Sequence, residues 1–165
     1  MKRVLIAALA MLTISAGAVA ANKSAAANKP AVPEKPNFSG EWTMNAAKSN
    51  FGQLPPPAKF VRKIQHSEPS LTVIEEQSAS GGDSTTTRKI TTDGKSVTLE
   101  LNGAAALCSS VWDGADIVAT TALDSAGLKF TDRMSLSSDG KMLTSKVQIA
   151  TPQGDADLII VFDRQ

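Results

Sequence analysis

The chain has 165 residues, of which 17 are basic and 16 acidic, so its formal net charge is +1. A nearly neutral chain of this length predicts a single domain, and it excludes the strongly basic surface that nucleic acid or an anionic membrane requires. The single cysteine, Cys108, cannot form a disulfide within one chain, and we expect it to be a small buried hydrophobic residue.

The first 20 residues have the pattern of a secretory signal peptide. Lys2 and Arg3 precede an apolar run over residues 4–12, and the small residues 18–20 form a cleavage pattern. A membrane anchor is the alternative, but the run is short for a bilayer span, so we expect no integral membrane span after cleavage. The sequence therefore predicts an exported protein, periplasmic or extracellular, that is cut after Ala20.

Residues 21–37 consist mainly of alanine, asparagine, lysine and proline, and they show no apolar periodicity. Such a composition cannot bury a hydrophobic core, and it predicts a disordered or extended linker. We expect the folded domain to occupy residues 38–165.

Glycines then mark turns at short, regular intervals from Gly82 to Gly154. The segments between them are short, rich in β-branched residues and partly alternating, which is typical of antiparallel strands joined by tight reversals. The ten expected strands are 38–44, 59–66, 71–77, 84–90, 96–102, 105–112, 116–123, 128–136, 142–150 and 156–164. The pattern predicts an all-β, antiparallel up-and-down meander of eight to ten strands. Closure into a barrel would remove the exposed sheet edges, and an open sandwich is the alternative.

One long connection interrupts this rhythm at residues 45–58. Asn45 is suited to cap a helical turn, and the three prolines at 55–57 then block any helix or central strand. A connection of this length in a tight meander is either a functional lid or mouth, or a surface spacer.

The first expected strand carries Phe38, Gly40 and Trp42 in the pattern Phe-x-Gly-x-Trp. This pattern resembles the opening strand of the calycin superfamily, which includes lipocalins and fatty-acid-binding proteins. Over residues 37–165 the chain is most similar to bacterial secreted lipocalin-like domain proteins. The resemblance implies a lipocalin-like barrel in which Gly40 and Trp42 are structural residues at the closed base.

The chain departs from fatty-acid-binding proteins on the last expected strand. Those proteins usually hold a ligand carboxylate with an Arg-x-Tyr pair, whereas the matching positions here are Ile160 and Phe162, and the chain has no tyrosine. The resemblance therefore implies a binding fold without that carboxylate site.

Alternation along two strands places polar residues on an inward face. Arg62 and His66 share a face with Phe60 and Ile64, and Asp132 interrupts an apolar row on the eighth strand. A charge that faces inward must be paired or must meet water or ligand. The alternatives are an ordinary internal ion pair and a surface position misread by one residue.

Arg133 falls on the polar face of the eighth strand, although a one-residue bulge would turn it inward. With the apolar residues of the same strands, this gives six candidate ligand-binding residues: Arg62, His66, Phe130, Asp132, Met134 and Arg133.

No residue constellation indicates catalysis, a metal site or a cofactor. Nothing places the single histidine beside Cys108, and the neighbours Glu75 and Glu76 point to opposite faces of a strand. We therefore expect a non-enzymatic exported barrel that binds a small hydrophobic or amphipathic ligand. The alternative is a periplasmic protein-interaction module, such as a β-barrel protease inhibitor whose N-terminal tether enters the protease.

Overall fold

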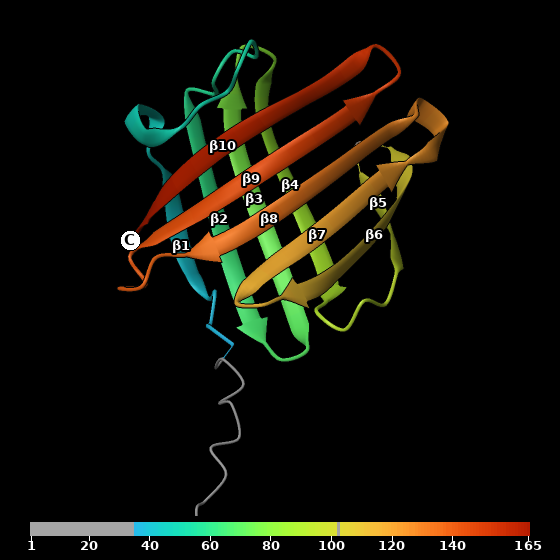
Figure 1. The fold of residues 1–165 in the computed structure, drawn as a ribbon. Helices are drawn as coiled ribbons and strands as arrows, with labels where there is room; N and C mark the ends of the chain where they lie inside the picture. The colour runs from blue at the N-terminus through green and yellow to red at the C-terminus, as the bar shows by residue number, and fades with distance from the viewer. Residues whose placement is uncertain (1–34, 102) are drawn as a thin grey trace, which may run out of the picture. The chain divides into compact units, whose positions relative to one another are not determined.

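The computed structural model describes residues 35–101 and 103–165, so the expected signal peptide and residues 21–34 of the linker lie outside the described residues. The described chain forms one antiparallel sheet of ten strands (Figure 1). The strands are β1 (Gly40–Met44), β2 (Lys59–Ser67), β3 (Ser70–Ala79), β4 (Gly82–Thr91), β5 (Val97–Leu101), β6 (Ala104–Asp113), β7 (Asp116–Leu123), β8 (Leu128–Leu136), β9 (Met142–Thr151) and β10 (Gly154–Arg164). Two 3-10 turns are present, η1 (Ala46–Lys48) and η2 (Asp124–Ala126).

The sheet order is β4-β3-β2-β1-β10-β9-β8-β7-β6-β5, so each strand pairs with its neighbours in sequence except β4 with β5, and β1 also pairs with β10. In Figure 1, β1–β4 run steeply while β5–β10 cross them on a diagonal, and the two groups enclose the core between them. The prediction of an all-β antiparallel meander is confirmed. The ten strands lie within one or two residues of the expected ranges.

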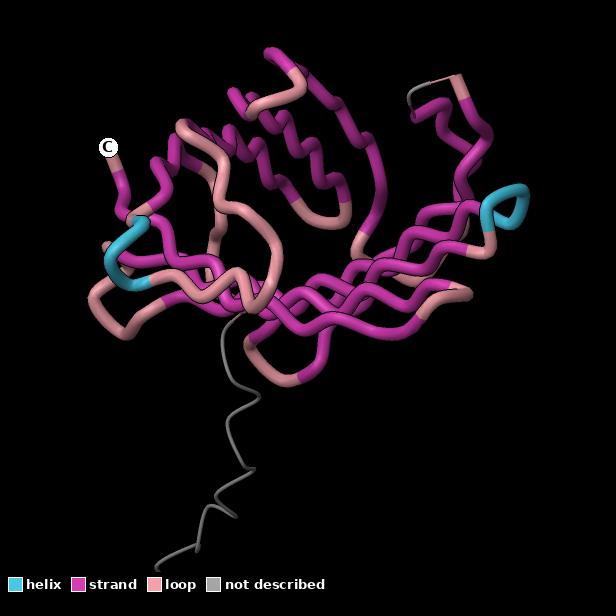
Figure 2. The backbone as a smooth tube through the Cα atoms, turned by 90° about the horizontal axis from the view of Figure 1, so that it is seen from above, coloured by secondary structure: helices cyan, strands magenta, loops and turns pink. Residues whose placement is uncertain are grey.

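The barrel is closed by strand pairing everywhere except between β4 and β5, which are not joined by a ladder (Figure 2). The segment that follows β4 runs along β6 instead. Asp93 forms an isolated bridge with Val111, and the Gly94 amide donates to the Ser110 carbonyl over 2.9 Å. The short strand β5 pairs only with β6, so the lipocalin-like barrel that the sequence predicted is nearly closed, with its one unpaired seam between β4 and β5.

One end of the barrel interior, which we call the closed end, is filled by side chains around Trp42. Phe38, Trp42, Leu71, Met134 and Leu143 are all fully buried there. A large aromatic residue on the first strand contributes much of the apolar area that such a small core can bury. Trp42 also donates its indole N–H to the Phe38 carbonyl over 3.1 Å, so its polar atom is satisfied.

Gly40 is required by the way Arg164 covers Trp42. The Arg164 guanidinium lies 4.4 Å from the Trp42 ring centroid, a cation–π distance. Gly40 has φ = 147°, and a Cβ at this position would lie 3.2 Å from Arg164 Nη1. A glycine therefore permits both the backbone conformation and the stacking.

At the closed end, Glu68 forms contacts with three side chains from different parts of the chain. Its Oε1 accepts from Trp112 Nε1 over 2.8 Å and from Thr92 Oγ1 over 3.0 Å, and it lies 2.9 Å from His66 Nε2. Burial alone would raise the pKa of Glu68, but the hydrogen bonds from His66, Trp112 and Thr92 together lower it. This carboxylate fixes the β2–β3 turn against β6.

No helix in the described residues has the length and apolar character that a bilayer crossing demands.

Candidate functional site

The inward-facing positions of the strands divide the interior into a packed half and an open half. The open half is the end of the interior that holds a cavity. On β2, Ile64 faces the packed half and Phe60 faces the open half. On β8, Met134 likewise faces the packed half and Phe130 faces the open half. Arg62 and Asp132 occupy the inward positions between them, one pleat repeat away in each direction. The charged residues therefore lie at the floor of the open half.

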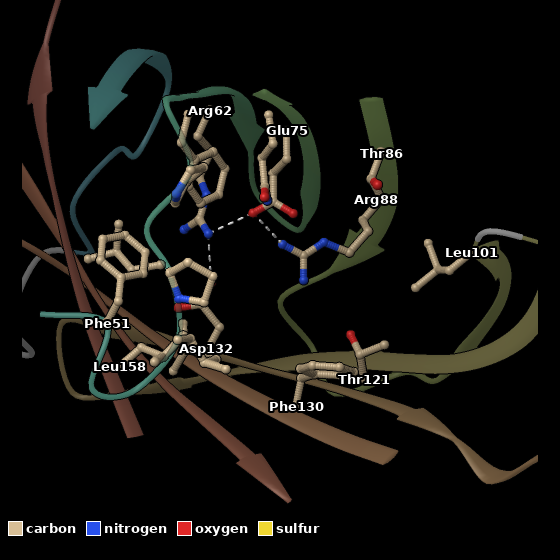
Figure 3. A pocket seen from close by; sticks show the side chains of 17 residues that line it. Phe51, Arg62, Glu75, Thr86, Arg88, Leu101, Thr121, Phe130, Asp132 and Leu158 are labelled. Carbon is tan, nitrogen blue, oxygen red and sulfur yellow. Dashed lines mark ion pairs between the residues drawn. The ribbon is translucent and has the colours of Figure 1, made fainter. Parts of the chain in front are cut away.

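A buried ion-pair network forms this floor (Figure 3). Arg62 Nη2 lies 2.6 Å from Glu75 Oε1 and 3.1 Å from Asp132 Oδ2, so one guanidinium joins β3 to β8 across the interior. Arg62 Nη1 also donates to Ser145 Oγ over 3.0 Å, and Ser145 in turn donates to Asp132. Arg88 Nη2 completes the network at 3.1 Å from Glu75 Oε1.

Burial and charge act on these groups in opposite directions. Burial lowers the pKa of Arg62, but attraction to Asp132 and Glu75 outweighs it, so the pKa is raised above its ordinary value. Burial likewise raises the pKa of Glu75, but Arg88 and Arg62 outweigh it and hold the pKa below its usual range. Both groups are therefore charged at neutral pH, and the side chain of Arg62 is only 3% exposed.

Above the floor is a cavity of about 350 Å³. Most of the wall is apolar: Phe51, Leu54, Pro55, Pro57, Phe60, Leu101, Phe130, Val147, Leu158 and Ile160. Polar groups at Gln77, Thr86 and Thr121 add to the four charged residues. A mostly apolar cavity with a few convergent polar groups is the usual form of a small-molecule site.

The connection between β1 and β2 covers this cavity. Its prolines at 55 and 57, with Phe51 and Leu54, contribute to the wall. The connection therefore lies at the mouth rather than serving as a distant surface spacer. Leu54 remains 45% exposed, so part of its apolar surface still faces solvent.

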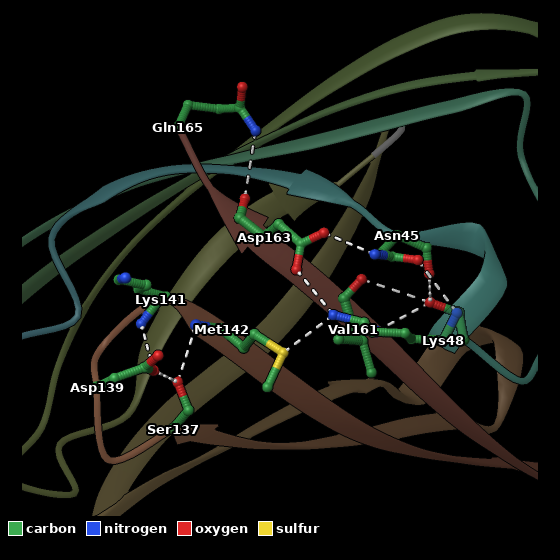
Figure 4. Close-up of polar contacts among 10 residues, drawn as sticks. Asn45, Lys48, Ser137, Asp139, Lys141, Met142, Val161, Asp163 and Gln165 are labelled. Carbon is green, nitrogen blue, oxygen red and sulfur yellow. Dashed lines mark hydrogen bonds and ion pairs between the residues drawn. The ribbon is translucent and has the colours of Figure 1, made fainter.

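The first half of the connection is fixed to β10. The backbone N–H of Asn45 donates to the Val161 carbonyl over 2.7 Å, and the side-chain Nδ2 of Asn45 donates to Asp163 Oδ2 over 2.6 Å (Figure 4). Asn50 and Ile159 exchange two backbone hydrogen bonds of 2.7 and 2.8 Å. Beyond Gly52, which has φ = 59°, the chain crosses the mouth until the Ala58 amide donates to Ser78. We call residues 51–57 the lid.

The structure brings three of the six candidate residues together. Arg62 and Asp132 form an ion pair, and both line the cavity with Phe130 (Figure 3). Since the eighth strand pairs with β7 and β9 in continuous register through Asp132, the inward face was assigned correctly.

The other three candidates do not line the cavity, and the placement of His66 corrects the expectation that it shares a polar cluster with Arg62 and Asp132. His66 is four residues beyond Arg62 on β2, roughly 13 Å away at a strand's rise, and belongs to the closed end. Met134 is buried in the packed half. Arg133 points outward and pairs with Asp113 and Asp116, since no bulge turns it inward.

Sequence reasoning missed Glu75 and Arg88 as members of the site. The prediction that Glu75 and Glu76 point to opposite faces is confirmed, because Glu76 pairs outward with Lys63 at 2.7 Å. The same alternation places Glu75 inward with Leu71 and Val73, and it could have identified Glu75. Arg88 shares an inward face with the buried Ile90 on β4 in the same way.

Cys108 is buried, as expected, and its thiol donates to Thr121 Oγ1 over 3.5 Å. In the described part of the chain, no group of three or more histidine, cysteine, aspartate or glutamate residues is arranged to hold a metal ion.

Comparisons with known proteins relate the chain to others by fold. No protein-family model matches it, and no curated protein sequence matches it. Among solved structures, a secretory abundant heat soluble protein from Ramazzottius varieornatus has a TM-score of 0.61 at 14% identity, covering 78% of this chain and 95% of that one.

Two further structures are binding proteins by their descriptions. Zebrafish ileal bile acid-binding protein, complexed with cholic acid, has a TM-score of 0.58 at 17% identity and covers 78% of this chain and 98% of that one. Fatty-acid-binding protein 1 of Echinococcus granulosus has a TM-score of 0.54 at 11% identity, with 77% and 96% covered. The chain thus shares the antiparallel barrel fold of these proteins.

Proposed function

We propose that this chain is an exported, non-enzymatic lipocalin-like protein that binds a small hydrophobic or amphipathic molecule in the cavity above Arg62. The observation that carries the proposal is the cavity itself: about 350 Å³ of space, mostly apolar, with a charged floor and a lid. A core that served stability alone would be filled by side chains, as the closed end of this barrel is by Phe38, Trp42, Leu71, Met134 and Leu143.

The fold supports this function without determining the ligand. Proteins with similar barrels include one described as binding bile acid and one described as binding fatty acid, at identities under 20%. Both ligand classes are amphipathic. The export part of the proposal depends on the signal-peptide pattern of residues 1–20, and a bacterial secreted origin depends on the resemblance of residues 37–165.

Filling the cavity tests the proposal. Val147 lines the cavity on β9, whereas its neighbour Lys146 is exposed on the outer face of the same strand. We expect Val147→Trp to abolish binding of the neutral dye Nile red, measured by fluorescence titration, and Lys146→Trp to leave it unchanged. Equal binding by both variants, with both folded by circular dichroism, would place the bound dye outside the cavity and contradict the proposal.

A further inference from the structure

We propose that the cavity selects uncharged amphipathic molecules whose head group accepts a hydrogen bond, and discriminates against carboxylates of the same chain length. Fatty alcohols and primary fatty amides have the required chemistry. This inference rests on the proposed ligand-binding function and adds the charge class of the ligand to it.

The first step is the charge balance of the cavity floor. Two guanidinium groups, Arg62 and Arg88, face two carboxylates, Glu75 and Asp132, so the four side chains that line the cavity sum to zero charge. A bound carboxylate would add a third negative charge to a site already balanced. An uncompensated charge is strongly disfavoured where water is excluded.

The second step is that Arg62 is already committed to the protein. It contacts Glu75, Asp132 and Ser145, and its guanidinium lies 4.9 Å from the centroid of the Phe162 ring. A ligand carboxylate could reach it in a bidentate manner only by displacing one of these carboxylates. The displaced carboxylate would then be buried without a partner, at a cost that offsets the new contact.

The third step concerns hydrogen-bond donors that the protein leaves open. The Nε atoms of Arg62 and Arg88 are buried and have no acceptor among the described residues. Arg88 contacts Glu75 through Nη2, and Figure 3 shows its guanidinium reaching from β4 toward Glu75. A neutral oxygen at this floor can accept from the Arg88 guanidinium without adding charge.

An ammonium head group fits no better than a carboxylate. Glu75 Oε1 and both carboxylate oxygens of Asp132 already accept from Arg62, Arg88 and Ser145. The buried side-chain polar atoms without a partner among the described residues are both arginine donors, and a cationic head group would meet these two guanidinium groups. The ligand's tail would then extend toward the lid, where Phe51 and Leu54 form the apolar mouth.

Calorimetry with decanol, decanamide, decanoate and decylamine at neutral pH tests the inference on the mature chain, because these probes differ only in the head group. We expect decanol and decanamide to bind at least tenfold more tightly than decanoate and decylamine, about 1.4 kcal/mol. If decanoate binds as tightly as decanol, the inference is overturned while the proposed function stands. If none of the four binds, both fail.

A charge-switch variant gives the second readout. Glu75→Gln leaves the floor with a net charge of +1, so we expect the ratio of decanoate to decanol affinity to rise at least tenfold. Glu76→Gln is the matched control, because this neighbour pairs with Lys63 on the outer face. Asp132→Asn should produce the same switch, should Glu75→Gln fail to fold. An unchanged ratio in a folded floor variant overturns the inference.

Discussion

Arg62 and Asp132 lie on strands β2 and β8, which are not neighbours in the sheet, yet Arg62 Nη2 is 3.1 Å from Asp132 Oδ2. The ion pair therefore ties opposite walls of the barrel at the height where the packed core ends. Arg62 also pairs with a second carboxylate, that of Glu75, which lies directly opposite Arg62 in the β2–β3 ladder. The floor of the cavity thus combines one local pairing with one pairing across the interior.

Removing the shared cation should destabilise the fold strongly. Arg62→Ala leaves Asp132 without its arginine and Glu75 with Arg88 alone, and breaking a buried pair in this way costs about 3–5 kcal/mol. Urea unfolding followed by tryptophan fluorescence measures the change. Lys63→Ala removes the neighbouring exposed pair with Glu76 and should change stability little. Similar losses from the two variants would contradict a special role for the floor.

The lowered pKa of Glu75 predicts how stability depends on pH. Its folded pKa lies below the ordinary value of 4.5, so the unfolded chain takes up a proton first as the pH falls. The stabilisation by Glu75 is therefore complete above about pH 4.5 and is lost as the pH falls through the lower folded pKa. The stability difference between the wild type and Glu75→Gln should be largest at neutral pH and should shrink in acid. A difference that stays constant from pH 7 to pH 3 in urea unfolding would contradict this assignment.

Alternation and turn spacing predicted the fold because each relies on neighbouring residues or neighbouring strands. The glycine-marked turns indicated the strands from β4 onward, and the period of two placed Arg62 and Asp132 on the inner face. The contact between these two residues depends on barrel curvature, which no local pattern encodes. His66 was grouped with them because alternation reports the face of a strand and not the height along it.

The cavity could not be predicted from the sequence either, because it also depends on contacts between segments that are distant in the chain. The prolines at 55–57 predicted a break in the meander, but a break does not show where the chain runs. That course is set by backbone bonds from Asn50 to Ile159 and from Ala58 to Ser78, which join segments distant in sequence. Glu75 could have been identified earlier, since its position opposite Arg62 follows from the β2–β3 hairpin register.

Gly40 should tolerate alanine poorly. A side chain there meets both an unfavourable φ of 147° and the Arg164 guanidinium at 3.2 Å, so Gly40→Ala should cost about 1–3 kcal/mol. Gly114→Ala is a control with positive φ but open space around it. A larger loss at Gly40, measured by thermal unfolding, would report the contact with Arg164. Equal losses would show that backbone strain alone decides.

Export can be tested without reference to the fold. When the complete chain is produced in a bacterium, we expect the mature protein to begin at Ala21 and to appear outside the cytoplasm. N-terminal sequencing and intact mass of the fractionated protein give the cleavage site. Ala20→Arg should block cleavage, because the site requires a small residue. An uncleaved chain that stays in the cytoplasm would refute the signal-peptide interpretation.

The lid should contribute affinity through Leu54. This side chain lines the mouth and is 45% exposed, so a ligand tail can bury the remainder of its surface. Burying about half of a leucine is worth about 1 kcal/mol, so Leu54→Ala should weaken decanol binding about fivefold. Leu107→Ala is the matched control, because Leu107 is 48% exposed on β6 and does not line the cavity. If both substitutions leave decanol affinity unchanged while the cavity-filling Val147→Trp abolishes it, the ligand lies deeper, against the charged floor. The lid then covers the cavity without contacting the tail.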